Sequence, residues 1–290
     1  MKNNQSSQSA AGVALLRAIE SQKPAGERIC YDPFARALIP GGISFTLSKW
    51  VIESGLYDRM APGATAFVIA RERYIDDYLI FELAEGLDQV VILGAGFDTR
   101  AYRIPGIEKT RVFEIDHPDT QTEKLKRIKK AINPLPVNIT FVPIDFNTQT
   151  LEECLHNNGY DEKAKTLFIW QGVTYFLTTK GIESTLAFIA NHSGPGSMVI
   201  FDYFYNETLR DTTRRDVKIL RQAARMTGEE YMYGFDQGQI EPFLVQRGFG
   251  SVHDATLEDL KRLYFTGVNA GRFMPDGIAI ASAKVNQTRD

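Results

Sequence analysis

The sequence predicts an α/β fold, with N-terminal helices before a mostly parallel sheet whose last strand is antiparallel. Five apolar stretches alternate with helix-like stretches between residues 89 and 204, which is typical of a parallel sheet with helices on both faces. The first stretch, "VVIL", runs into the turn "GAG" at residues 94–96, where such sheets bind ligands. Two further apolar stretches close the chain with little between them, which favours an antiparallel strand at 277–285.

The individual elements follow in order along the chain. Residues 9 to about 85 have helical spacing, with breaks at Asp32-Pro33 and at 39–42 and a long helix from 64 to 83. Strands are then predicted over 89–96, 110–116, 139–145, 165–173 and 197–204, and helices over 118–131, 151–157 and 179–191. After residue 205 the pattern predicts a basic helix over 209–226, another helix over 235–248, and strands at 250–257 and 277–285.

Length and composition indicate one domain of an ordinary globular protein. The 290 residues can bury a full core, and 43% of them are apolar. We expect a single domain, divided into a helical cap (1–85), a ligand-binding core (86–205), a helical lid (206–248) and closing strands (249–290).

Charge and residue counts exclude several classes of function. The formal net charge of −3 predicts no electrostatic attraction to nucleic acid or to an anionic membrane. No apolar run approaches the roughly 18 residues of a membrane span, and residues 10–16 are expected in an amphipathic helix rather than a signal peptide. Two cysteines are too few for a disulfide scaffold, and the four histidines are scattered without ligand spacing. We therefore expect a cytoplasmic protein without a metal.

Glycines at the end of the first strand indicate a ligand-binding turn. Gly94 and Gly96 let the backbone approach a nucleoside closely at the start of a helix. Asp116 lies 20 residues beyond Gly96, at the end of the second strand, where a carboxylate can accept two hydrogen bonds from a ribose. Glu114, on the same face of that strand, is the competing candidate, but Asp116 is nearer the carboxyl edge. The alternative is that Asp116 only caps the helix opening at Pro118.

The third strand ends in a second acidic residue. Asp145 and Phe146 close "FVPIDF", where a carboxylate can hold an adenine amine while an aromatic ring packs on the base. The alternative is a turn aspartate beside a core phenylalanine. Taken together, three consecutive strand ends offer glycine backbone, a ribose acceptor and a base clamp, which predicts an adenosine site.

Seven stretches in this order resemble class I S-adenosylmethionine-dependent methyltransferases. The nearest resemblance is to the leucine carboxyl methyltransferase family with its bacterial polyketide O-methyltransferase-like relatives. The stretches span residues 10 to 205 and are "ALLRAIES", "YDPFARALIP", "IARERYIDDYL", "LGAGFDTRAYRI", "FEIDHP", "FVPIDF" and "IWQGVTYFLT". The resemblance implies a Rossmann-like fold, S-adenosyl-L-methionine as cofactor and methyl transfer as the activity.

The resemblance also implies roles for individual residues. Arg71, in "IARERY", matches an arginine that holds the cofactor's carboxylate, and a guanidinium is suited to grip a carboxylate at two points. Arg73 is two residues away and leaves the register open, and a solvated helix charge is the other reading of Arg71. The family's cofactor glycine, ribose acid and adenine pair match Gly94, Asp116, and Asp145 with Phe146.

Two positions depart from familiar patterns. Relatives often carry a glutamate after the fourth strand, where this chain has Gln171, whose amide oxygen accepts a hydrogen bond from the methionine ammonium but adds no charge. The other reading of Gln171 is a plain polar group at a strand end. Thr99 stands where a dinucleotide fingerprint needs a third glycine. Because S-adenosylmethionine has no phosphate to rest on that helix start, Thr99 favours it over a nicotinamide cofactor.

The predicted reaction is O-methylation of a carboxylate or an acidic hydroxyl on a small molecule or a peptide end. A carboxylate is already ionised at neutral pH, and no histidine lies at an obvious strand end to act as a base, apart from His117 beside the ribose acid. Tyr175 and Tyr203 are expected to line the acceptor pocket. The equally favoured alternative is that both are tyrosines at the edge of the apolar core. A silent cofactor-binding protein and a nicotinamide-dependent oxidoreductase are the alternatives.

The basic segment after the fifth strand is a candidate substrate lid. On one helix, Arg214, Lys218, Arg221 and Arg225 form a single stripe. We expect this stripe, through Arg214 and Arg221 in particular, to attract an anionic acceptor, whereas the plainer reading is a solvated basic face.

Overall fold

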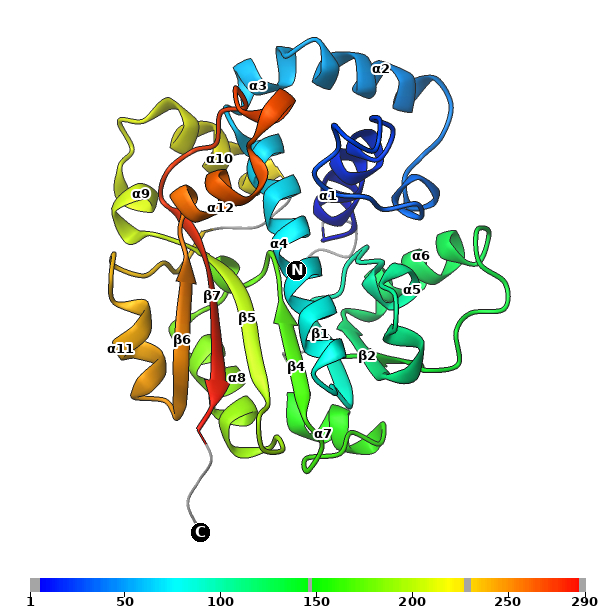
Figure 1. Ribbon diagram of the computed structural model, residues 1–290, viewed down its shortest axis with the longest axis vertical. Helices are drawn as coiled ribbons and strands as arrows, with labels where there is room; N and C mark the ends of the chain where they lie inside the picture. Colours follow the sequence, from blue (N-terminus) through cyan, green and yellow to red (C-terminus); the bar gives the residue numbers. More distant parts are fainter. Residues whose placement is uncertain (1–5, 146–147, 227–230, 287–290) are drawn as a thin grey trace.

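The computed structural model describes residues 6–145, 148–226 and 231–286. Its strands form one sheet in the order β3-β2-β1-β4-β5-β7-β6 (Figure 1). β1 to β5 pair in parallel, whereas β7 is antiparallel to both of its neighbours, β5 and β6. This confirms the predicted sheet and its antiparallel last strand. The strands are Gln89–Leu93 (β1), Arg111–Asp116 (β2), Ile139–Pro143 (β3), Thr166–Trp170 (β4), Met198–Phe204 (β5), Phe249–Ala255 (β6) and Ile278–Val285 (β7).

Helices precede the sheet and alternate with its strands. The N-terminal helices are α1 (Ser6–Glu20), α2 (Ile43–Glu53), α3 (Leu56–Met60) and α4 (Ala64–Ala84). The others are α5 (Arg100–Arg103), α6 (Pro118–Ile128), α7 (Leu151–Asn157), α8 (Thr179–Asn191), α9 (Asn206–Arg210), α10 (Arg215–Met226), α11 (Ile240–Val245) and α12 (Leu257–Tyr264). No helix in the described ranges is long and apolar enough to cross a bilayer.

Two apolar cores lie on the two faces of the sheet. β1, β4 and β5 are buried over their whole length because helices cover both faces. Val90 and Ile92 face the core under α4 and α12, whereas Val91 and Leu93 face the core under α7, α8 and α11. In Figure 1, α4 crosses in front of the sheet. Burial on both faces is the reason that these strands are continuous apolar runs in the sequence.

The segment after β5 differs from the prediction of one basic helix over 209–226. Two helices, α9 and α10, are separated by residues 211–214. The Asp211 carboxylate accepts hydrogen bonds from the backbone N–H of Thr213 (3.0 Å) and from its hydroxyl (2.5 Å), which turns the chain between the helices. The helix expected over 235–248 is also shorter, because Phe235 pairs in extended conformation with Tyr205 before α11 begins.

The N-terminal helix packs close to the glycine turn. α1 contacts α4 and α6. A Cβ placed on Gly96 would lie 3.3 Å from the Ala10 side chain, so α1 lies directly against the turn that follows β1. The helical segment before the sheet is therefore part of the surroundings of the predicted ligand site.

Candidate functional site

The glycine turn and Asp116 meet at the carboxyl edge of the sheet. Gly94 and Gly96 have φ values of +66° and +48°, which side-chain-bearing residues rarely adopt. The Asp116 carboxylate accepts the backbone N–H of Gly96 and that of His117, the latter at 2.6 Å. Burial raises the pKa of Asp116, and the two backbone donors offset only part of that rise. The strand end thus holds a carboxylate directly beside the turn.

The competing acid, Glu114, points elsewhere. Its side chain is 1% exposed and one carboxylate oxygen pairs with Lys124 Nζ at 2.6 Å. Two residues further along β2, Asp116 is only partly buried. Of these two acids, therefore, only Asp116 is accessible at the edge where a nucleoside would bind.

Arg71 lies buried at the same edge, in α4. Its Nη1 donates to Asp202 Oδ2 (2.5 Å) and to the Tyr175 hydroxyl (3.3 Å). Its Nε is buried and has no hydrogen-bond partner among the described residues. Arg73, the alternative in register, is 47% exposed and pairs with Asp77 at 2.8 Å. Of these two arginines, Arg71 is therefore the one with a buried N–H donor that has no partner among the described residues.

Gln171 directly follows β4 and contacts α4. Its Nε2 donates to Glu72 Oε2 at 2.8 Å. Its Oε1 is buried and accepts no hydrogen bond from the described residues. Among the described residues, the site therefore combines an unpaired buried acceptor on Gln171 with an unpaired buried donor on Arg71. Gln171 is linked to α4 through Glu72, and the carboxylate of Asp202 accepts both from Arg71 and from the N–H of Gly172.

Behind these residues lies a buried cluster of charges that the sequence analysis missed. Glu72 is the centre of the cluster, with Arg17, Arg100 and Arg103 within 3.2 Å of its Oε1. The cluster joins α1, α4 and the turn after β1, and its other acids are Asp32, Asp76 and Asp98. The sequence does contain a signal for buried acids. Glu72 and Asp76 are four residues apart in α4 and share a helix face with Ile69 and Leu79, which are core residues.

Asp145 lies next to Asp116 across the strand ends. The backbone N–H of Ile144 donates to the Asp116 carbonyl at 2.9 Å, which brings the following residue beside the second strand. Asp145 also begins a turn, since its carbonyl accepts the N–H of Thr148 at 3.0 Å. Phe146, its predicted partner for adenine, lies outside the described residues. The adenine pair thus stays a prediction.

The two predicted acceptor-pocket tyrosines lie on opposite faces of the sheet. Tyr175 joins Arg71 and is 7% exposed, and burial raises its pKa well above the ordinary value. Tyr203 faces the other core, where its hydroxyl donates to Asp254 Oδ1 at 2.9 Å. Because strand residues alternate between faces, Asp202 points toward Arg71 and its neighbour Tyr203 points away. The structure does not bring Tyr203 to the candidate site.

The expected basic stripe belongs to α10 and to the residue directly before it. Arg214 precedes α10 and pairs with Asp276 at 2.6 Å, in the segment before β7. An N–H of Arg221 donates to the carbonyl of Leu209 in α9. Arg214 therefore links the segment to the residues before β7, whereas Arg221 links α10 to α9. The carbonyl of Arg214 accepts the N–H of Lys218 at 3.2 Å, so Arg214 lies at the start of α10, and the basic stripe as an attractor of substrate stays a prediction.

Two of the histidines are brought together by the fold, contrary to the expectation that all four are scattered. His156 Nε2 and His192 Nδ1 each lie 2.5 Å from Glu162 Oε1, at the amino ends of β4 and β5. Each imidazole can donate an N–H to this carboxylate oxygen, so hydrogen bonds account for the arrangement without an ion. The cluster lies at the opposite end of the sheet from Asp116.

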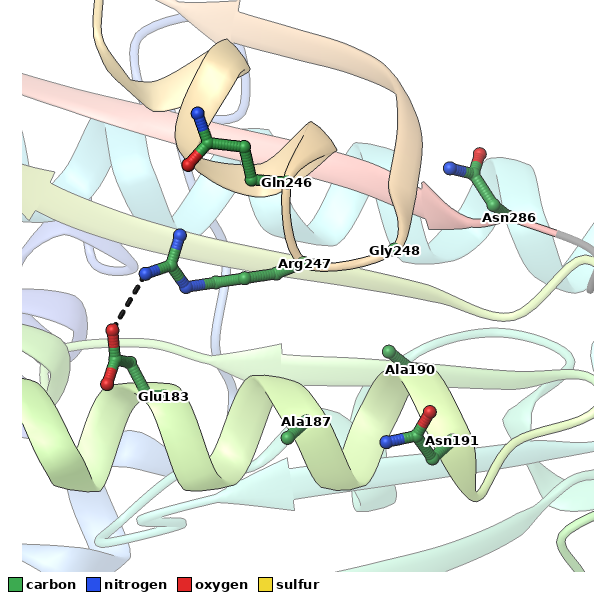
Figure 2. Close-up of a pocket in the computed structure, with 8 residues that line it drawn as sticks. All are labelled: Glu183, Ala187, Ala190, Asn191, Gln246, Arg247, Gly248 and Asn286. Atoms are coloured by element: carbon green, nitrogen blue, oxygen red, sulfur yellow. Dashed lines mark hydrogen bonds and ion pairs between the residues drawn. The ribbon is translucent and has the colours of Figure 1, made fainter.

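A separate pocket lies on the face of the sheet that α7, α8 and α11 cover. Figure 2 shows it between α8 and the turn after α11, with Arg247 reaching to Glu183 at 2.7 Å. None of the site residues predicted from the sequence lines it. The pocket therefore does not belong to the group formed at the carboxyl edge by Asp116, Arg71 and Gln171.

Comparisons with known proteins show the family and the fold. Residues 10–190 match the family described as leucine carboxyl methyltransferase. YktD of Bacillus subtilis, named as a candidate S-adenosyl-L-methionine-dependent methyltransferase, is 35% identical over 202 residues, which are 68% of this chain and 66% of that protein. A similarly named protein of Streptomyces coelicolor is 30% identical over 188 residues, 65% of each chain. The matches thus span just under two thirds of each relative's length.

A solved structure shares the fold. The crystal structure of a candidate methyltransferase from Thermobifida fusca superposes with a TM-score of 0.58 and 15% identity, and covers 94% of both chains. At this level of identity the likeness shows the fold alone.

Proposed function

The chain belongs to the leucine carboxyl methyltransferase family, and we propose that it transfers a methyl group from S-adenosyl-L-methionine to an oxygen of an organic acid or acidic hydroxyl. The observation that carries this proposal is the pair of buried atoms at the carboxyl edge, Arg71 Nε and Gln171 Oε1, neither of which has a hydrogen-bond partner in the described part of the chain. An amino-acid end needs both a donor for its carboxylate and an acceptor for its ammonium. The methionine end of the cofactor fits this pair.

The nucleoside end fits the neighbouring strand ends. Asp116 accepts the ribose hydroxyls beside the glycine turn, and Asp145 takes the adenine amine together with Phe146. A dinucleotide fits less well, because a carboxylate already takes the backbone donor at the start of α5. There the Asp98 carboxylate accepts the N–H of Arg100 at 2.6 Å, and the Thr99 hydroxyl donates to Asp32 at 2.7 Å. An anionic pyrophosphate would meet a carboxylate at that position, which argues against a nicotinamide cofactor.

The bound cofactor supplies an electrophilic methyl group on a sulfonium. The protein's own part is to align the acceptor oxygen with that methyl and to exclude water. The Tyr175 hydroxyl stays protonated at neutral pH because its pKa is raised by burial, so it serves as a hydrogen-bond donor and not as a base. The ring of His117 accepts the backbone N–H of Asp119 at 3.3 Å and caps α6. The scarcity of bases supports an acceptor that is already ionised, such as a carboxylate of a small molecule or a peptide end.

Calorimetric titration tests the cofactor assignment. S-adenosylhomocysteine is expected to bind and NADH is not; the reverse result would favour the oxidoreductase alternative. Arg71→Lys keeps the charge facing Asp202 but removes the Nε donor, so it is expected to weaken S-adenosylhomocysteine about tenfold or more.

The acceptor class is tested with a methyl-labelled cofactor and a matched set of carboxylic acids and phenols. Methyl esters release labelled methanol in mild base, whereas methyl ethers do not. Label released by base is the expected result. Stable label would point to a hydroxyl acceptor. Binding of cofactor without transfer to any acceptor would support the silent-binder alternative.

A further inference from the structure

Glu72 holds the amide of Gln171 in one orientation. The carboxylate of Glu72 is fully buried and can only accept hydrogen bonds, so the nearer end of the Gln171 amide must be the N–H₂ group. The amide oxygen is therefore turned away from Glu72, and in that position it is buried without a partner among the described residues. The contact between these two residues thus decides which atom Gln171 offers to a ligand.

Glu72 also keeps its negative charge. Burial opposes ionisation, but Arg100, Arg17 and Arg103 outweigh it and hold the pKa of Glu72 far below its ordinary value. Within the described cluster, three guanidinium groups face four carboxylates, which leaves one negative charge in formal excess. The carboxylates are Asp32, Glu72, Asp76 and Asp98. In a buried environment, an amide whose N–H donates to a carboxylate becomes a stronger acceptor at its oxygen.

We propose that Glu72 is a positioning residue for the cofactor, which fixes the Gln171 amide and supplies through it the negative charge that attracts the methionine ammonium. This inference rests on the proposed function and deepens it. The chain places this carboxylate one hydrogen bond behind the Gln171 amide, on α4. An ammonium offers three N–H donors, and the free Gln171 oxygen takes one of them.

The arrangement makes an unusual prediction for Gln171→Glu. A glutamate at position 171 would bring a second carboxylate to about the 2.8 Å that now separates Gln171 from Glu72. Two carboxylates at that distance repel each other or share a proton. The substitution is therefore expected not to tighten cofactor binding, whereas a glutamate acting alone would tighten it. With Glu72→Gln in the same chain, the added carboxylate has an amide partner again and is expected to strengthen binding.

The experiment uses calorimetry with two ligands, S-adenosylhomocysteine and its analogue with hydrogen in place of the amino group. Gln171→Leu is expected to weaken S-adenosylhomocysteine roughly tenfold or more, and to weaken the analogue less than threefold, because only the first ligand has an ammonium. Gln171→Glu is expected to give equal or weaker binding of S-adenosylhomocysteine. Glu72→Gln with Gln171→Glu is expected to bind it at least about tenfold tighter than Glu72→Gln alone.

Glu82→Gln is the matched control, since Glu82 is a buried acid of the same helix paired only with Lys165 (3.2 Å) in the ion pairs described. It is expected to leave both affinities unchanged. Thermal melts report whether each variant folds. If Glu72→Gln does not fold, the affinities of Gln171→Leu and Gln171→Glu for the two ligands test the role of Glu72 by themselves.

Tighter binding of S-adenosylhomocysteine by Gln171→Glu, or equal losses for both ligands in Gln171→Leu, would overturn the role of Glu72 and leave the proposed function standing. Failure of the unaltered chain to bind S-adenosylhomocysteine would overturn both.

Discussion

Replacing Asp116 by alanine tests the centre of the nucleoside site. Each oxygen of this carboxylate already accepts one backbone N–H, from Gly96 or His117, and each keeps a lone pair for a ribose hydroxyl. Hydrogen bonds to a charged group are individually strong, and two of them to the ribose are together worth about 2–4 kcal/mol. The dissociation constant for S-adenosylhomocysteine is therefore expected to rise roughly thirtyfold to several hundredfold.

The protein itself is expected to stay folded. The Gly96 N–H lies at the partly buried edge, so the loss of its partner costs about 1 kcal/mol. Calorimetry gives the affinity, and a thermal melt verifies folding. Glu114→Gln is the control, because the side chain of Glu114 faces Lys124 inside the protein and does not reach the edge. A loss below threefold for Asp116→Ala, or an equal loss for folded Glu114→Gln, would refute the assignment of Asp116 to the ribose.

Three further outcomes are expected. Because burial raises the pKa of Asp116, its carboxylate takes up a proton at a higher pH than an ordinary aspartate does. The affinity for S-adenosylhomocysteine should therefore fall as the solution becomes acidic. A pH series in which Asp116→Asn shows the same fall would contradict this. Gly94→Ala places a Cβ 2.6 Å from Val173 Cγ2 and should lower stability by about 1–3 kcal/mol more than Gly55→Ala, where φ is similar (+73° against +66°) but the space is open. Equal melting temperatures would argue against a tight turn. Neutralising Arg214 and Arg221 together should raise the acceptor KM with cofactor affinity nearly unchanged, because Arg214 pairs with Asp276 before β7 and Arg221 holds α10 to α9. An unaltered KM at low salt would mean that the segment only covers the domain.

Most of the sheet was predictable from the sequence because parallel strands buried on both faces are continuous apolar runs. The starts of α7 and α8 were also predictable from the sequence. Thr150 and Thr178 are their N-caps, and each side chain accepts a backbone N–H three residues further on. Position along the strand alone favours Asp116 over Glu114 as the ribose acid, and the side chain of Glu114 is buried against Lys124.

What escaped prediction depends on contacts between distant parts of the chain. Arg17 meets Glu72 across 55 residues, and no local period encodes such a pairing. His156 and His192 belong to different helices and meet only because both helices end at the same edge of the sheet. The turn at 211–214 depends on one aspartate side chain, which helical spacing of the flanking residues conceals.

The position of β7 has a consequence for how the chain is made. β7 lies between β5 and β6, so the two strands that flank it in the sheet are synthesised before it. Until residues 278–285 leave the ribosome, β5 presents an unpaired edge of seven residues that are all buried in the finished protein. Such edges template association with other chains. Loss of these residues by truncation should therefore produce aggregation rather than a smaller soluble domain.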